Sequence, residues 1–235
     1  MREILINGKW PLNLLEHRAE RPEWPYWEAA TLALAHSLIS EGTVVWDVGS
    51  EEGDFPALFG TWGAEVVLIE PNPHVWPQIR LHWEANNDRN PLACVVGLAS
   101  DHIDPATPDY RAGIAEKRRG GIWPHVAFGE VMPAHGFRHI WEHAKVSPQF
   151  RLDQLAPWGT PDLITMDIEG GELIALRGCE DVLIGFHPDV MVSVHPAFMA
   201  DLYGQTPAEL LEFMDSVGYK GKLYATDHEE HWWFQ

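Results

Sequence analysis

A glycine-containing loop is the first feature of this sequence that could carry chemistry. The segment Asp47-Val48-Gly49-Ser50-Glu51-Glu52-Gly53 leaves a predicted strand and leads into a helix, and such turns let a nucleotide-like cofactor approach the backbone closely. Its spacing differs from a dinucleotide fingerprint, and Glu51, Glu52 and Asp54 would repel a pyrophosphate. A cofactor with a cationic centre and no phosphate fits this loop better, and S-adenosylmethionine is such a molecule.

An acidic residue follows the next predicted strand, Glu65–Ile69. Glu70 stands about twenty residues after the loop, where a carboxylate can accept hydrogen bonds from both hydroxyls of a ribose. Two structural alternatives stay open: Asp47 could only cap the following helix, and Glu70 could only be an exposed strand end. The residues expected from the sequence pattern to bind the cofactor are Asp47, Gly49, Ser50, Gly53 and Glu70.

Three further polar side chains follow the fourth and fifth predicted strands. Asp167 and Glu169 come at the end of the strand Asp162–Asp167, and His195 follows the strand Val190–Val194. The carboxyl ends of parallel strands share one edge, where ligands bind. Methyl transfer from a sulfonium requires an aligned acceptor, and an alcohol acceptor must also lose its proton. We therefore expect His195 to act as a general base, with Asp167 and Glu169 orienting the acceptor or the cofactor amine.

The same three side chains allow two other interpretations. They could bind a divalent cation that lowers the pKa of the acceptor hydroxyl, although we expect no metal requirement. Asp167 and Glu169 could also cap the helix that begins near Gly170.

Short apolar strands that alternate with helices must position these residues. Continuous apolar runs in this rhythm predict an α/β fold, with a parallel sheet covered on both faces. The remaining expected elements are strands Thr43–Asp47 and Ala93–Leu98, helices Glu28–Ile39, Pro56–Gly60 and Val75–Asn87, a helix between Thr206 and Gly218, and a final hairpin of Tyr219–Ala225 and His231–Phe234.

The rhythm also defines the domain organisation. We expect an N-terminal extension and helix over residues 1–42 and one domain over residues 43–235. Residues 102–149 interrupt the pattern with scattered Pro, Gly and His, which predicts an irregular insertion with short strands or helical turns. Substrate specificity is expected to lie there.

From about Thr43 to Tyr219 the chain resembles the FkbM family of S-adenosylmethionine-dependent methyltransferases. The segments that carry the resemblance are Val45–Gly49, Ile69–Asn72, Leu98–Asp101, Arg151–Leu155 and Leu163–Glu172. The resemblance implies a class I, Rossmann-like methyltransferase sheet, mostly parallel and seven-stranded with a C-terminal antiparallel hairpin. It also implies O-methylation of a sugar or another small hydroxylated molecule. The cofactor contacts that it adds are Pro71, Asn72, Ser100, Asp101 and Asp167.

The chain departs from the family pattern at four residues. Ser50-Glu51 stands where the family usually has Ala-Asn, Thr165 where Lys is common, and Gly171 where Ala is usual. Two alternative functions therefore stay open. One is an NAD-dependent oxidoreductase on a related sheet, which the acidic loop disfavours. The other is a catalytically inactive binding or assembly module of the same fold, which the departure at Ser50-Glu51 suggests.

Composition limits the partners. The chain has 16 Lys and Arg against 35 Asp and Glu, a formal net charge of −19, which repels nucleic acid. We interpret the basic run Lys117-Arg118-Arg119 as a solvated loop, and His135, His139 and His143 as surface or substrate-pocket histidines rather than a metal site.

The start of the chain and its apolar runs carry further expectations. No apolar run approaches the roughly 20 residues that span a bilayer, and Asn7, Gly8 and Lys9 interrupt the start where a secretory signal would need an apolar stretch. We expect a cytoplasmic protein that uses a small-molecule or glycan substrate and no membrane. A homo-oligomer stays open, because the aromatic runs near Trp24 and Trp232 could form a subunit contact.

Overall fold

A computed structural model describes residues 1–105, 123–124, 147–227 and 229–235. Its centre is a seven-stranded sheet in the order β10-β11-β9-β8-β3-β4-β5. Strands β9, β8, β3, β4 and β5 are mutually parallel, whereas β11 runs antiparallel to both β9 and β10. The strands are β3 Val44–Val48, β4 Glu65–Ile69, β5 Ala93–Val95, β8 Leu163–Met166, β9 Asp189–Val194, β10 Gly221–Thr226 and β11 Glu230–Phe234. The expected mostly parallel sheet with a C-terminal antiparallel hairpin is confirmed.

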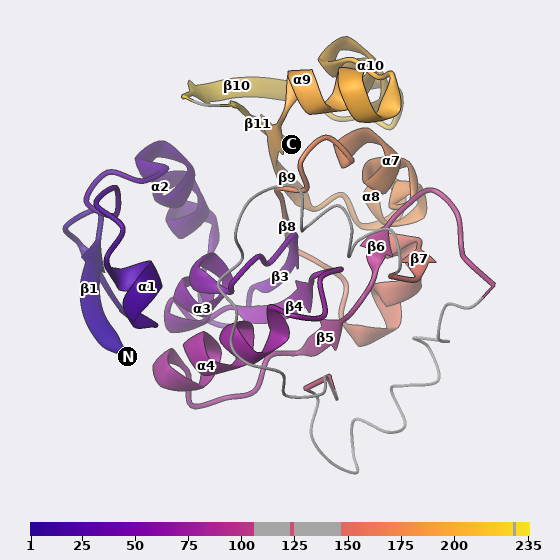
Figure 1. The fold of residues 1–235 in the computed structure, drawn as a ribbon. Helices are drawn as coiled ribbons and strands as arrows, with labels where there is room; N and C mark the ends of the chain where they lie inside the picture. Colours follow the sequence, from indigo (N-terminus) through magenta and orange to yellow (C-terminus); the bar gives the residue numbers. More distant parts are fainter. Residues whose placement is uncertain (106–122, 125–146, 228) are drawn as a thin grey trace.

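Helices cover both faces of this sheet, as expected (Figure 1). One face carries α2 Ala29–Leu38, α3 Asp54–Thr61 and α4 Trp76–Asn86, and the other carries the 3₁₀ helix η1 Leu152–Trp158, α7 Glu172–Arg177, α8 Glu180–Phe186 and α10 Pro207–Ser216. The short helix α9 Pro196–Phe198 and the π-helical turn η2 Met199–Tyr203 follow β9. Thr206 caps α10 by accepting a hydrogen bond from the amide of Glu209, as its sequence signature indicates.

The two hydrophobic cores follow from the alternation of side chains along the strands. In β3, Val45 packs on the face of α2, α3 and α4, and its neighbour Trp46 packs on the face of α7 and α8. Asp47 lies two residues after Val45 and on the same side of the sheet. At this end of β3, the side of the sheet that faces α3 becomes polar. Buried apolar residues therefore hold the sheet, and polar residues occupy one edge of it.

The N-terminal segment forms an additional hairpin that the sequence interpretation did not include. Strands β1 Arg2–Ile6 and β2 Trp10–Leu14 pair in antiparallel register, and helix α1 Glu16–Ala19 follows them. The segment lies against α4: the amide of Asn13 donates to Asn86 (2.7 Å), and the amide of Leu15 donates to Nε2 of His82 (2.9 Å). In Figure 1 these indigo elements lie beside α2 and α3.

The expected third strand, Ala93–Leu98, is wrong in its second half. Strand β5 ends at Val95, and β6 Leu98–Ala99 pairs with β7 Gln149–Phe150 in a separate two-stranded sheet. Gly97 bends the chain between β5 and β6, and a Cβ there would lie 2.8 Å from the ring of Phe150. A close approach of β7 at this glycine therefore redirects the chain.

Most of the expected insertion lies outside the described residues. This includes the histidines at 135, 139 and 143 and the basic run Lys117-Arg118-Arg119. In the part of the chain that the structure describes, no helix is long and apolar enough to cross a membrane.

Candidate active site

A cavity of about 860 Å³ opens at the carboxyl edge of the parallel strands. Residues that follow β3, β4, β6, β8 and β9 line it, together with part of the N-terminal segment. This volume lies within the roughly 300–1,000 Å³ typical of small-molecule sites. The residues expected from the sequence that line it are Asp47, Gly49, Ser50, Glu70, Pro71, Asn72, Ser100, Asp101, Asp167, Glu169 and His195.

Gly53 does not line the cavity. It is the N-cap residue of α3, with φ of 87°, and a Cβ on it would lie 2.9 Å from Cα of Ile79. Its role in the structure is therefore to let α3 pack closely against α4. Asp47 does not cap α3, because that helix has no side-chain cap hydrogen bond.

The glycine loop is tied to the end of β4. The amides of Gly49 and Ser50 both donate to the carbonyl of Ile69, at 2.9 and 3.1 Å. Gly49 has φ of 92°, and a Cβ there would lie 1.9 Å from the carbonyl oxygen of Asp167. Only glycine permits this approach, which places the loop directly against the residue that follows β8.

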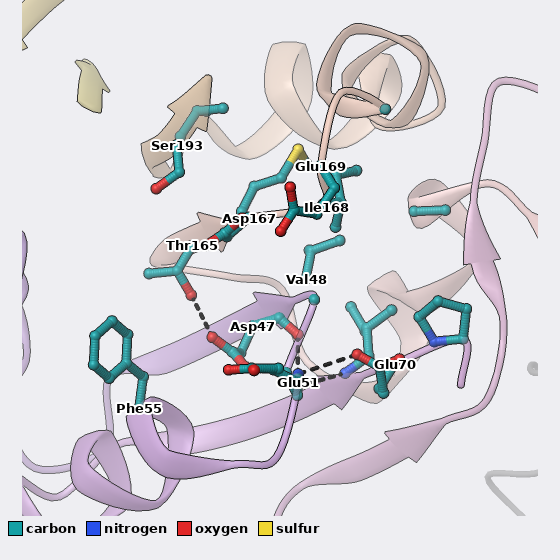
Figure 2. A pocket seen from close by; sticks show the side chains of 18 of the residues that line it. Asp47, Val48, Glu51, Phe55, Glu70, Thr165, Asp167, Ile168, Glu169 and Ser193 are labelled. Atoms are coloured by element: carbon teal, nitrogen blue, oxygen red, sulfur yellow. Dashed lines mark hydrogen bonds between the residues drawn. The ribbon is translucent and has the colours of Figure 1, made fainter. Parts of the chain in front are cut away.

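Glu70 is buried rather than exposed, with 6% of its surface accessible. Its Oε2 accepts the amide of Glu51 (3.0 Å), and its Oε1 accepts the amide of Asn72 (2.7 Å). Burial raises the pKa of Glu70 to about 8, against the effect of these two hydrogen bonds. Two fixed amides therefore orient a carboxyl group at the cavity wall, and each oxygen keeps a lone pair for a ligand hydroxyl (Figure 2).

Asp47 is the second buried acid on this wall. Its Oδ1 accepts a hydrogen bond from the hydroxyl of Thr165 (2.9 Å), whereas Oδ2 is buried and has no hydrogen-bond partner among the described residues. Burial raises the pKa of Asp47 to about 6, and hydrogen bonds to Ser50 and Thr165 oppose that shift. An orphaned acidic oxygen is favourable only when a cation or a donor reaches it.

One arginine forms ion pairs with all three carboxylates of the loop, those of Glu51, Glu52 and Asp54. Arg18, from α1, donates to both carboxylate oxygens of Glu51 (3.2 and 3.0 Å) and to Asp54, and lies 3.9 Å from Glu52. Glu51, Glu52 and Asp54 therefore repel a phosphate less than their sequence alone suggests, because a cation distant in the chain contacts them.

His195 also lines the cavity, and it lies among four carboxyl groups. Its Nδ1 is 3.1 Å from Oε1 of the fully buried Glu172, and its Nε2 forms an ion pair with Oε2 of Glu229. Nε2 also lies 3.5 Å from Oε2 of Glu169 and 3.6 Å from Oδ1 of Asp167. Figure 2 shows Asp167 and Glu169 beside each other, across the cavity from Asp47 and Glu70.

This environment sets the protonation of the group. Although burial favours neutral imidazole, hydrogen bonds to Glu172 and Glu229 raise the pKa of His195 to about 11. Burial raises the pKa of Glu169 to about 7, although His195 opposes the shift. At neutral pH His195 is therefore an imidazolium, which argues against the general-base role that we expected for it. The capping alternative for Asp167 and Glu169 is wrong, because α7 has Gly171 as its N-cap and no side-chain cap.

The comparison with protein families shows to which family this chain belongs. The model described as the methyltransferase FkbM domain matches residues 47–220. The chain belongs to the FkbM methyltransferase family. Members of this family use S-adenosylmethionine, so the NAD-dependent alternative is not retained.

The solved structure of one FkbM methyltransferase agrees with this fold. The FkbM methyltransferase from Methylobacillus flagellatus KT is 16% identical, with a TM-score of 0.54 over 93% of this chain and 49% of its own. The chain thus spans about half the length of that relative. The precorrin-6y C5,15-methyltransferase from Geobacter metallireducens GS-15 is 12% identical, with a TM-score of 0.48 over 95% and 92% of the two chains. No curated protein sequence matches the chain.

The residues present fit the cofactor of the FkbM family. Glu70 offers two oriented oxygens suited to ribose hydroxyls, and the orphaned Oδ2 of Asp47 suits a cationic group. S-adenosylmethionine carries both features, a ribose and a charged sulfonium and amine.

Three residues that face the site of this FkbM chain were missed by sequence reasoning. Arg18 and Glu28 come from the N-terminal segment, where no local pattern marks them. Glu229 precedes β11, and its position could have been inferred, because an antiparallel strand next to β9 begins at the edge where β9 ends. Glu28 and Glu229 place carboxylate oxygens within 4.8 Å of a His231 ring nitrogen.

Proposed function

We propose that this chain transfers a methyl group from S-adenosylmethionine to a hydroxyl oxygen of a sugar or another small hydroxylated molecule. The observation that carries the proposal is the position of two chemically different walls in one cavity. Asp47 and Glu70 suit the cofactor, and Figure 2 shows Asp167 and Glu169, two members of the His195 cluster, across the cavity from them. We define this cluster as His195, Asp167, Glu169, Glu172 and Glu229.

Glu70 would bind the ribose hydroxyls, and Asp47 would hold a charged group of the cofactor. S-adenosylmethionine, when bound, supplies a methyl group activated by the sulfonium. The departing methyl leaves S-adenosylhomocysteine, and the new C–O bond requires that the acceptor hydroxyl release its proton. The protein contributes alignment and a proton acceptor, because no covalent intermediate is needed.

Glu169 is the proton acceptor in this proposal. Its carboxylate lines the cavity and has a pKa near 7, which suits a general base at neutral pH. His195 already carries a proton and acts instead as a fixed cation between Asp167, Glu169 and Glu229. The hydrogen bond between Nδ1 of His195 and Oε1 of Glu172 fixes the orientation of the imidazole ring.

The acidity of the chain supports a small acceptor rather than a nucleic acid. A net charge of −19 and several carboxylates at the cavity disfavour a polyanion. Trp27 and Tyr224 also line the cavity, and aromatic rings offer flat apolar surfaces to a small ligand. The cytoplasmic location and a homo-oligomeric state stay predictions.

A divalent cation is the second candidate for activating the acceptor. Asp167, Glu169 and His195 place one ligand atom each within 4.8 Å of one another. The hydrogen bond from Nδ1 of His195 to Glu172 resembles the carboxylate–histidine pairs that orient metal-ligating imidazoles. Oxygen-rich sites with one imidazole suit Mg²⁺ or Mn²⁺. A cation bound to Nε2 would have to displace the ion pair between Nε2 and Glu229.

Methyl transfer from isotope-labelled S-adenosylmethionine to a panel of hydroxylated compounds tests the proposal. The panel contains monosaccharides, oligosaccharides, polyols and phenols, and the products are located by mass spectrometry and NMR. We expect a labelled methyl ether on at least one compound. A product methylated on nitrogen or carbon contradicts O-methylation. Cofactor binding with no transfer to any compound supports the inactive-module alternative.

A further inference from the structure

Arg18 lies outside the part of the chain that matches the FkbM domain, yet it reaches the cofactor loop. It belongs to α1, and only 5% of its side chain is exposed. Trp24 holds it in two ways: the indole Nε1 donates to the carbonyl of Arg18 (2.6 Å), and the guanidinium lies 5.7 Å from the centre of the indole ring. Contacts within the N-terminal segment therefore hold Arg18 in place, and its guanidinium contacts the loop.

The guanidinium joins the loop through several charge-assisted hydrogen bonds. Nη1 and Nη2 donate to the two carboxylate oxygens of Glu51, and Nη2 also donates to Asp54. A two-pronged contact of this kind fixes the carboxylate in position and direction, which a lysine cannot reproduce. Arg18 thus sets where Glu51 lies.

The loop also depends on Arg18 for its charge balance. Glu51, Glu52 and Asp54 place three carboxylates within four residues, and Glu52 and Asp54 are buried. Among the ion pairs of the described residues, Arg18 is the only Arg or Lys that contacts any of them. Loss of this cation would increase the repulsion among the three acids, and only the contact of His17 with Glu52 (2.6 Å) would remain beside Glu52.

Glu51 connects this contact to the cofactor wall. Its backbone has φ of 47°, a conformation that L-residues adopt at a cost. In that conformation its amide donates to Oε2 of Glu70 at 3.0 Å. Arg18 therefore holds the side chain of the same residue whose amide orients Glu70.

We propose that Arg18 is a positioning residue for the cofactor: it holds the loop so that the amide of Glu51 presents the carboxyl group of Glu70 to the ribose. This inference rests on the proposed function, since it assigns the ribose to Glu70. It also gives the N-terminal segment a role, because Arg18, Trp24, Trp27 and Glu28 all line the cavity. The cofactor site is incomplete with residues 47–220 alone.

The test measures S-adenosylhomocysteine binding by calorimetry in wild type, Arg18→Gln, Arg18→Lys, Glu51→Gln and the double variant Arg18→Gln/Glu51→Gln. Arg89→Gln is the matched control, because Arg89 pairs with Glu41 on the surface and does not line the cavity. We expect Arg18→Gln to weaken binding about 10- to 100-fold, the range of a lost charged hydrogen bond. Arg18→Lys should retain part of the affinity, and the control should equal wild type.

The two-residue cycle separates positioning from a general structural role. If Arg18 acts through Glu51, the double variant binds no more weakly than Arg18→Gln alone, and KM for S-adenosylmethionine rises more than kcat falls. If Arg18→Gln folds and binds S-adenosylhomocysteine as tightly as wild type, the inference is overturned. It is also overturned if the losses of affinity in Arg18→Gln and Glu51→Gln add up in the double variant. If Arg18→Gln does not fold, wild-type affinity in Arg18→Lys and Glu51→Gln overturns it. Failure of wild type to bind contradicts the proposed function instead.

Discussion

The backbone amide of Glu51 donates a 3.0 Å hydrogen bond to the carboxyl group of Glu70. This contact joins the loop after β3 to the end of β4, two segments that sequence reasoning assigned separately to the cofactor. Because Arg18 holds the other end of Glu51, the N-terminal segment, the glycine loop and the acidic strand end form one connected wall.

Gly49→Ala should destabilise the protein severely. The new methyl group would lie 1.9 Å from the carbonyl oxygen of Asp167, and φ of 92° is unfavourable for alanine. Backbone strain alone costs about 1–3 kcal/mol, and the clash adds to it. Thermal unfolding measures the loss. Gly185→Ala is the control, since its Cβ would meet nothing within 4 Å, and equal stability of the two variants would contradict the described packing.

Glu169→Gln should lower kcat with little effect on the cofactor. Removing a general base typically reduces the rate by about 10²–10⁴-fold, and Glu169 stands at the wall opposite Glu70. The measurements are steady-state kinetics with an acceptor from the panel and calorimetry with S-adenosylhomocysteine. An unchanged kcat removes Glu169 from the proposed proton transfer.

Activity should survive removal of divalent cations. In the metal-free proposal His195 is held by Glu172 and Glu229 without an ion. The assay compares initial rates before and after EDTA treatment, with Mg²⁺ or Mn²⁺ added back. Rates that collapse with EDTA and return with the metal would favour the cation site of Asp167, Glu169 and His195.

The ligand-free protein should lose stability as the pH rises from about 6.5 to about 8.5. Glu70, Glu28 and Glu169 have pKa values raised to about 8, 8 and 7, and His195 to about 11. In this window the folded state holds more protons than the unfolded state, so unfolding becomes more favourable as pH increases. Each such group contributes up to about 1.4 kcal/mol per pH unit.

Thermal unfolding across this range checks the sign, and Glu70→Gln should flatten the slope because its amide does not titrate. Stability that increases with pH between these values, or an identical slope in Glu70→Gln, contradicts the assigned protonation states.

The sheet could be predicted from sequence because its strands are continuous apolar runs. Strand β4 has the bounds expected for it, Glu65–Ile69. Local patterns failed where a distant contact decides the structure: β7 approaches Gly97 and ends the third strand early. The N-terminal hairpin did have a local signal, since Asn-Gly is typical of hairpin turns, and Asn7 and Gly8 both have positive φ in the connection between β1 and β2.

The site was predictable only where it follows strand ends. Asp47 lies near the end of β3, and Glu70, Asp167 and His195 follow parallel strands; the structure brings all four to one cavity. Arg18 could not be found in this way, because its role depends on the packing of a separate hairpin. The protonation of His195 was equally hidden, since it depends on buried acids from other elements.

Calorimetric titration of S-adenosylhomocysteine into wild type and Glu70→Ala tests the central claim most directly. The account predicts saturable binding by wild type and an affinity at least about tenfold lower in Glu70→Ala, which lacks both oriented oxygens. Thermal unfolding of the free variant checks that it remains folded. Absence of wild-type binding at saturating ligand, or equal affinity of the two proteins, would contradict the cofactor site described above.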